Sequence, residues 1–172
     1  MGGVGKTTLL KRINNSFEGS DFELIIWVSV SKDFTIGEIQ RSIMKRCGMD
    51  GKNDKPHEME CKIRDFLKGK RYVLLLDDVW EALDLNSLGV PSRDNEVKSM
   101  ILITSRSKDV CDRMQATKVE VGCLNPEKAW ELFTAKVGKA ILTPDRETAE
   151  QICQYCDGLP LAIEVIGTAT RT

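Results

Sequence analysis

The sequence lacks the features that mark membrane-spanning and secreted proteins. Its longest purely aliphatic or aromatic runs, Leu24–Val28 and Tyr72–Leu76, are five residues each, whereas a membrane-spanning helix needs about 20 apolar residues. No charged and then apolar leader precedes the first motif. Internal repeats and low-complexity tracts are also absent from the sequence. We therefore expect no transmembrane segment and a cytoplasmic location.

An excess of charge of one sign is lacking as well. The chain has 25 Lys and Arg against 26 Asp and Glu, so its formal net charge is −1 and its pI is about 5.9. No basic field is available to attract DNA, RNA or anionic lipid, although a local basic patch is compatible with a neutral total. The composition therefore predicts no nucleic-acid partner.

The six cysteines lack the paired spacing of a disulfide or zinc framework. They stand at positions 47, 61, 111, 123, 153 and 156. Cys153 and Cys156 form a C-x-x-C, but the other half of a zinc site is absent and both fall on an apolar helical face. Reduced, structural thiols in a cytosolic-type compartment are the interpretation that fits this pattern.

What the 172 residues do contain is an alternation of strand-like runs and helical stretches, which favours a parallel α/β sheet. The expected strands are Phe22–Ser29, buried on both faces, Tyr72–Leu76, Met100–Thr104 and Lys118–Val121. Helix starts are expected at Lys6, at the capping box Thr35-Ile-Gly-Glu38, near Glu58, after Ser107, at Asn125-Pro126-Glu127 and at Thr143-Pro144-Asp145. Loops are expected at Gly48–Pro56 and Glu81–Val97, and a last helix follows the break at Gly158-Leu159-Pro160.

The first eight residues, MGGVGKTT, match all but the first glycine of the phosphate-loop motif G-x-x-x-x-G-K-[ST]. Glycines let backbone N–H groups curl around phosphates, Lys6 reaches the β/γ oxygens, and the Thr7 hydroxyl ligates Mg²⁺. The alternative is a glycine-rich turn before a helix. Because the motif would begin before Met1, we expect Met1 to be an internal motif residue. The predicted nucleotide-binding residues of the loop are Gly2, Gly3, Val4, Gly5, Lys6, Thr7 and Thr8.

Polar and charged residues follow two of the expected strands. Asp77 and Asp78 come directly after Tyr72–Leu76; Asp77 can hold Mg²⁺ through its water shell, and Asp78 can orient or deprotonate an attacking water. Arg106 follows the next strand and can pair bidentately with γ-phosphate oxygens. Ligands in open α/β sheets bind at this edge. The alternatives are an exposed acidic turn and a plain surface arginine.

The motifs occur in the order GGVGKTT, FELIIWVSVSKDF, YVLLLDDVW, ILITSR and CDGLPLAI. In this order they closely resemble the NB-ARC domain of plant NB-LRR disease-resistance proteins over essentially the whole chain. Trp80 after the two aspartates, and Trp27 in its WVSVS context, resemble the coiled-coil (non-TIR) class. Core packing is the alternative role of both tryptophans.

The resemblance implies a STAND-type switch that ADP holds off, ATP exchange turns on and slow hydrolysis resets. It assigns Lys6 to phosphate, Thr7 and Asp77 to Mg²⁺, Asp78 to hydrolysis, Arg106 to sensing and Pro160 to the adenine. For Gly158-Leu159-Pro160, a helix–turn–helix link is the alternative. Coiled-coil and leucine-rich-repeat domains of a parent protein are the implied intramolecular partners, with oligomerisation on activation.

The implied fold is an α/β P-loop NTPase parallel sheet flanked by helices, with its first strand missing, over residues 1–122. The start of a small all-helical ARC subdomain follows over residues 123–172. Because the missing strand would be an interior one, the isolated chain is expected to fold poorly and to bind nucleotide weakly. His57, at the end of a polar loop, does not replace the family's nucleotide-sensing histidine. Two other functions stay open: a P-loop ATPase or kinase enzyme, and a scaffold fragment without activity of its own.

Overall fold

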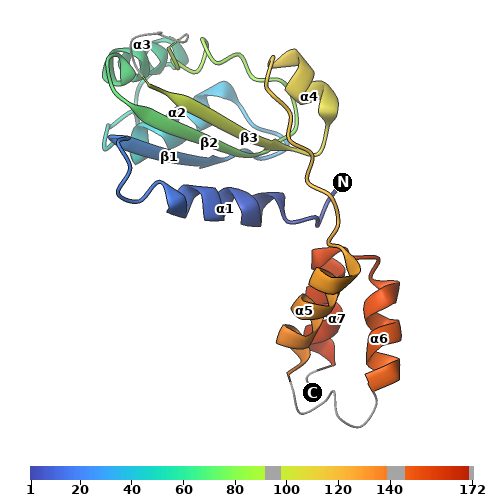
Figure 1. Cartoon of the computed structure of the whole chain (residues 1–172). Helices are drawn as coiled ribbons and strands as arrows, with labels where there is room; N and C mark the ends of the chain where they lie inside the picture. The colour runs from blue at the N-terminus through green and yellow to red at the C-terminus, as the bar shows by residue number, and fades with distance from the viewer. Residues whose placement is uncertain (92–97, 139–145, 171–172) are drawn as a thin grey trace. The chain divides into compact units, whose positions relative to one another are not determined.

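The structure, a computed structural model, describes residues 1–91, 98–138 and 146–170 (Figure 1). The described strands are β1 (Leu24–Ser29), β2 (Tyr72–Val79) and β3 (Met100–Ser105). The described helices are α1 (Lys6–Ser16), α2 (Ile36–Arg46), α3 (Pro56–Leu67), α4 (Lys108–Arg113), α5 (Pro126–Val137), α6 (Arg146–Tyr155) and α7 (Pro160–Ala169). In these parts of the chain, no helix is both long and apolar enough to cross a membrane.

The three strands form one parallel sheet in the order β1-β2-β3, which confirms the predicted α/β fold with helices flanking a parallel sheet. β1 pairs with β2 from Leu24 opposite Tyr72 to Ser29 opposite Asp77. β2 is buried along nearly its whole length because it lies between the other two strands. Parallel pairing brings the carboxyl ends of all three strands to the same edge of the sheet.

Helices cover both faces of the sheet, as Figure 1 shows. On one face, Ile26 and Leu74 pack with Ile43 of α2 and Ile63 of α3 in the largest buried cluster. On the other face, Leu10 of α1 packs with Val73 and Leu75 of β2. The alternation of β2 side chains between these two clusters is the period-2 pattern of a central strand.

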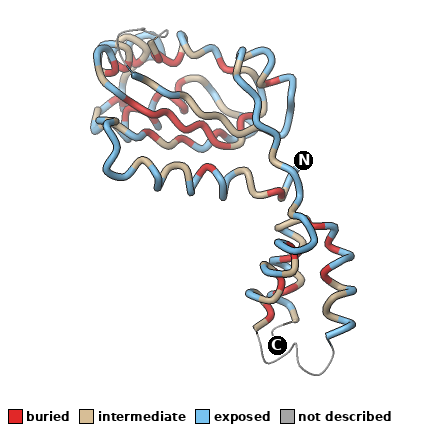
Figure 2. Tube along the Cα trace, viewed as in Figure 1, coloured by how far each residue is buried: buried red, intermediate tan, exposed pale blue. Residues whose placement is uncertain are grey.

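Two strand predictions are wrong in physically instructive ways. Lys118–Val121 forms no ladder with any described strand, and Val119 is 82% exposed. An extended run becomes a strand only where a neighbour supplies hydrogen bonds. β1 is not buried on both faces either, because it is an outer strand of the described sheet and is only partly buried along its length (Figure 2). Ile25 in this strand is 38% exposed.

The predicted helix starts agree with the structure better than the predicted strands do. Thr35 and Glu38 form the predicted capping box at α2, and the Asn125 side chain accepts the Lys128 N–H at the start of α5. Ser107 precedes α4 but makes no side-chain cap. The expected helix start at Thr143-Pro144-Asp145 lies outside the described residues. His57 lies in the first turn of α3, because that helix begins at Pro56.

The chain divides into two compact units, one of residues Thr7–Lys118 and one of Met1–Lys6 with Val119–Thr172. The second unit contains α5, α6 and α7, and its apolar core is built from Phe133, Ile163, Ala129, Val137, Cys153 and Cys156. Gly158 links α6 to α7 with φ +65°, and a Cβ there would lie 2.1 Å from the Leu124 carbonyl oxygen. Only glycine satisfies both conditions, which explains the break before Pro160.

Candidate functional site

The glycine-rich loop runs from Met1 to Gly5 and leads directly into α1. Gly3 and Gly5 have φ values of +76° and +94°, a region that residues with a Cβ rarely adopt. Lys6 is the first residue of α1, and its Nζ donates to the carbonyl oxygen of Met1. The loop thus has the backbone freedom and the helix amino terminus that phosphate binding needs.

The same loop contacts the segment that carries Pro160. The Leu161 N–H donates to the Gly3 carbonyl oxygen at 3.2 Å. A Cβ at Gly3 would lie 3.0 Å from the Leu161 Cβ and 3.5 Å from the Leu159 Cδ1. Pro160, the first residue of α7, therefore stands between two leucines that pack on the phosphate loop.

Asp77 is the best-anchored acid at the carboxyl edge of the sheet. It is 6% exposed, and one of its oxygens, Oδ1, accepts from Thr7 Oγ1 at 3.0 Å and from Thr104 Oγ1 at 2.6 Å. A buried carboxylate needs such donors, because an unsatisfied one is costly. The contact joins α1 to the end of β2, as expected if Thr7 and Asp77 serve one ion.

Thr104 was not assigned a role from the sequence, although it stands at the carboxyl end of a strand. In the structure its hydroxyl donates to Asp77 and accepts the Asp78 N–H at 2.9 Å. It therefore fixes both aspartates at once. Its position two residues before Arg106 was the available signal, but a threonine in a strand is equally typical of ordinary β structure.

Asp78 differs from its neighbour in backbone and in partner. Its φ is +58°, and the register between β2 and β3 shifts between Leu76 and Val79, so a β-bulge lies at this residue. The bulge directs the carboxylate to Arg106, whose Nε and Nη2 lie 3.1 and 3.4 Å from its two oxygens. Arg106 is thus paired with the predicted hydrolytic residue.

Trp80 lies beside the same arginine. The guanidinium carbon of Arg106 is 4.9 Å from the centre of the Trp80 ring, and the Lys32 ammonium is 5.6 Å from that ring. Both distances are within the range of cation–π interactions. The indole is only partly buried, so core packing is not its whole environment.

The donor set at this edge fits Mg²⁺. No cluster of three or more His, Cys, Asp or Glu side chains suited to a metal occurs within residues 1–91, 98–138 and 146–170. Mg²⁺ does not need one, since it is usually held by one or two carboxylates together with waters and substrate phosphates. The adjacent oxygens of Thr7 and Asp77 are ligands of this kind.

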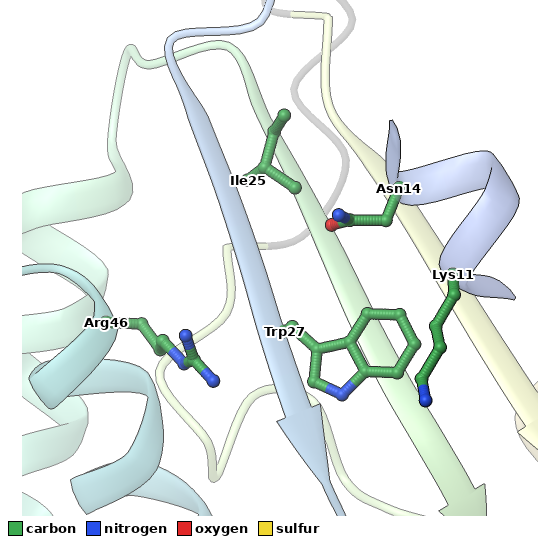
Figure 3. A pocket seen from close by; sticks show the side chains of 5 residues that line it. All are labelled: Lys11, Asn14, Ile25, Trp27 and Arg46. Carbon is green, nitrogen blue, oxygen red and sulfur yellow. The ribbon is translucent and has the colours of Figure 1, made fainter. Parts of the chain in front are cut away.

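A separate hollow of about 450 Å³ lies between α1, β1 and α2 (Figure 3). Lys11, Asn14, Ile25, Trp27 and Arg46 line it. None of these residues belongs to the predicted nucleotide site.

The predicted site residues fall into two groups. Those of the sheet edge are brought together in the unit Thr7–Lys118: Thr7, Asp77, Asp78 and Arg106. Gly2, Gly3, Val4, Gly5, Lys6 and Pro160 belong to the other unit, where Gly3 contacts Leu161. Thr8 lies on an exposed face of α1.

A glycine-rich loop that opens a helix, together with an acidic strand end in a parallel sheet, defines a nucleotide-binding α/β fold of the P-loop kind. The profile of the NB-ARC domain matches residues 1–143. The chain belongs to the NB-ARC family of nucleotide-binding domains.

Disease-resistance proteins of Arabidopsis thaliana are among the similar proteins. Disease resistance protein UNI is 44% identical over 97% of this chain, and disease resistance protein RPS5 is 45% identical over 98%. The probable disease resistance protein At4g14610 is 47% identical over 97%. The chain spans 20%, 20% and 24% of these three relatives' lengths.

Proposed function

We propose that this chain is the nucleotide-binding segment of a plant disease-resistance protein and acts there as an ADP/ATP switch in the defense response. Its family and the names of its relatives support this proposal. In it, residues 1–122 form the nucleotide-binding core and residues 123–172 begin the helical ARC subdomain. Coiled-coil and leucine-rich-repeat domains of the same protein are its partners, the protein is cytoplasmic, and it oligomerises on activation.

The observation that carries the proposal is the pair of hydroxyls on the buried Asp77 carboxylate. One hydroxyl belongs to Thr7, the residue directly after the phosphate-loop lysine in the sequence, so Thr7 and the acidic strand end offer adjacent oxygens that would hold Mg²⁺. In this assignment Lys6 contacts the phosphates, and Thr7 and Asp77 hold Mg²⁺. Pro160 packs near the adenine.

Hydrolysis is slow in the proposed cycle, and the Asp78–Arg106 pair gives a physical reason. Both oxygens of the Asp78 carboxylate accept N–H groups of the Arg106 guanidinium, so they are occupied and cannot orient a water until that partner leaves. When Arg106 turns to a γ-phosphate, Asp78 becomes available to orient a water. ATP would therefore both engage the sensor and release the hydrolytic residue.

The test is a titration of fluorescent ADP with Mg²⁺ into the intact protein that contains this chain. Lys6→Ala removes the cation of the phosphate loop, and Lys11→Ala, an exposed lysine of the same helix, is the matched control. We expect saturable binding that Lys6→Ala abolishes and Lys11→Ala retains. Thr7→Val and Asp77→Asn should remove the Mg²⁺ dependence of that binding.

Three outcomes would overturn the proposal. Equal binding by the protein with and without the Lys6 substitution would exclude the phosphate loop as the site. No binding by a demonstrably folded protein would favour a scaffold without a nucleotide. Rapid ATP turnover with transfer to an acceptor would instead favour a kinase.

A further inference from the structure

The carboxyl edge of the sheet holds an aromatic residue to which the proposed switch gives no role. Trp80 follows the β2 strand by one residue, and its ring lies 4.9 Å from the Arg106 guanidinium carbon. The Arg106 side chain is 51% exposed. An exposed arginine has several accessible rotamers, so something must select the one that faces the edge of the sheet.

We infer that Trp80 is a positioning residue for Arg106, which it holds at the sheet edge while the arginine exchanges the Asp78 carboxylate for the terminal phosphate of ATP. This inference rests on the proposed function and deepens it. It assigns the preference for a nucleoside triphosphate over a diphosphate to a pair, Trp80 and Arg106, rather than to the arginine alone.

The two contacts of Arg106 need not compete for the same N–H donors. Asp78 accepts from its edge, through Nε and Nη2. A cation–π contact uses the planar face of the same group and occupies no N–H donor. The ring contact can therefore persist when the edge changes from one anion to another. An anchor of this kind lowers the entropy that must be lost when the phosphate is bound.

Asp78 supplies the competing anion. It is held at φ +58° by the bulge of β2 and by the Thr104 hydroxyl, so its carboxylate stays opposite Arg106. Phosphate can displace it because a terminal phosphate carries more negative charge than a carboxylate and accepts the same two-pronged hydrogen bonds. The Lys32 ammonium, 5.6 Å from the Trp80 ring, adds a second positive charge near the same place.

The experiment compares Trp80→Phe with Trp80→Leu in the intact protein that contains this chain. Phenylalanine retains an aromatic face, whereas leucine retains apolar bulk without one. The dissociation constants of ADP and of a non-hydrolysable ATP analogue are measured with Mg²⁺. We expect Trp80→Leu to weaken the binding of the ATP analogue about two- to fivefold, because an exposed cation–π contact is of that strength. The affinity for ADP should stay unchanged. Trp80→Phe should retain most of the preference.

A double-mutant cycle separates positioning from packing. Arg106→Ala should remove the preference for the triphosphate, and Trp80→Leu should have no further effect in that background. Trp27→Leu, on another part of the sheet, is the control for loss of a tryptophan and should not change the ratio of the two affinities.

The contrary results distinguish the failure of the Trp80 role from the failure of the proposed function. Equal losses for ADP and the analogue, or equal behaviour of the phenylalanine and leucine variants, would reject the role of Trp80 while the switch stands. An unchanged effect of Trp80→Leu in the Arg106→Ala background would do the same. Failure of the unaltered protein to bind ADP would reject the proposed function and this role together.

Discussion

The contacts that stabilise the sheet edge differ in kind from those that stabilise the helical unit, which is the unit that contains α5, α6 and α7. At the edge, the Thr104 hydroxyl donates to Asp77 and accepts the Asp78 N–H, and the Asp78 carboxylate forms an ion pair with Arg106. In the helical unit, Phe133 is 1% exposed and Ile163 is 0% exposed, within a core of apolar side chains. Polar contacts can be replaced by a ligand's oxygens, whereas close packing cannot.

The difference shows where a nucleotide can act. A ligand that competes for Thr7, Asp77 or Arg106 replaces one hydrogen bond with another, so the rearrangement costs little. Separating α5 from α7 would expose apolar surface to water, which costs a free energy of about 25 cal/mol for each Å² exposed. We therefore expect the contacts of the sheet edge to change with nucleotide state, while α5 and α7 keep their packing in both states.

The largest effect on local stability is expected for Phe133→Ala in the helical unit. It leaves a cavity beside Ile163, so it should lower the local free energy of unfolding by about 3–5 kcal/mol. The measurement is amide hydrogen exchange of the intact protein, with α5 and α7 losing protection while β2 keeps it. The control is Glu131→Ala, an exposed change on the same helix, for which about 0.5 kcal/mol or less is expected. Equal loss of protection in β2 would mean that the two regions are not energetically separate.

A smaller effect is expected for Thr104→Val at the sheet edge. The valine has nearly the same shape but removes one donor from Asp77 and the acceptor of the Asp78 N–H. Leaving such groups unsatisfied should cost about 1–3 kcal/mol. Thr104→Ser keeps the hydroxyl and should restore most of the stability. Hydrogen exchange of the β2 amides distinguishes the two variants, and identical exchange would show that shape, not the hydroxyl, matters there.

Much of the fold could be predicted because its signals are local. The capping box at Thr35 and Glu38 and the cap at Asn125 depend on residues three positions apart, so the sequence alone contains them. The strand predicted at Lys118–Val121 failed because a strand also depends on a distant neighbour. The burial of Ile25 was overestimated for the same reason, since β1 has only one neighbour in the described sheet.

The candidate site was predictable in its residue types but not in its pairings. Asp77 and Thr7 could be chosen because both stand in recognisable motifs. The pairing of Asp78 with Arg106 could not, because it depends on a bulge that shifts the register between Leu76 and Val79. That shift changes the direction of a side chain without leaving a pattern in composition or spacing.

The smallest expected effect concerns the thiols of the helical unit. Burial raises the pKa of the Cys153 thiol, and the neighbouring Cys156 raises it further. Burial also raises the pKa of the Cys156 thiol. A raised pKa favours the neutral thiol in the folded unit, whereas an unfolded chain ionises near the ordinary value of 9.0. The thiols therefore stabilise the unit below about pH 9, and this contribution is lost as the pH rises through their folded pKa values.

Alkylation of the intact protein at about pH 8 checks this last prediction, since the thiolate is the reactive form. Cys123 is exposed in the same unit and should react first, while Cys153 and Cys156 should stay protected. Phe133→Ala opens the core that covers them, so it should bring their rates closer to that of Cys123. Thr104→Val should not, because its effect belongs to the sheet edge. If both variants exposed the thiols equally, the contrast between exchangeable polar contacts and fixed packing would not describe this molecule.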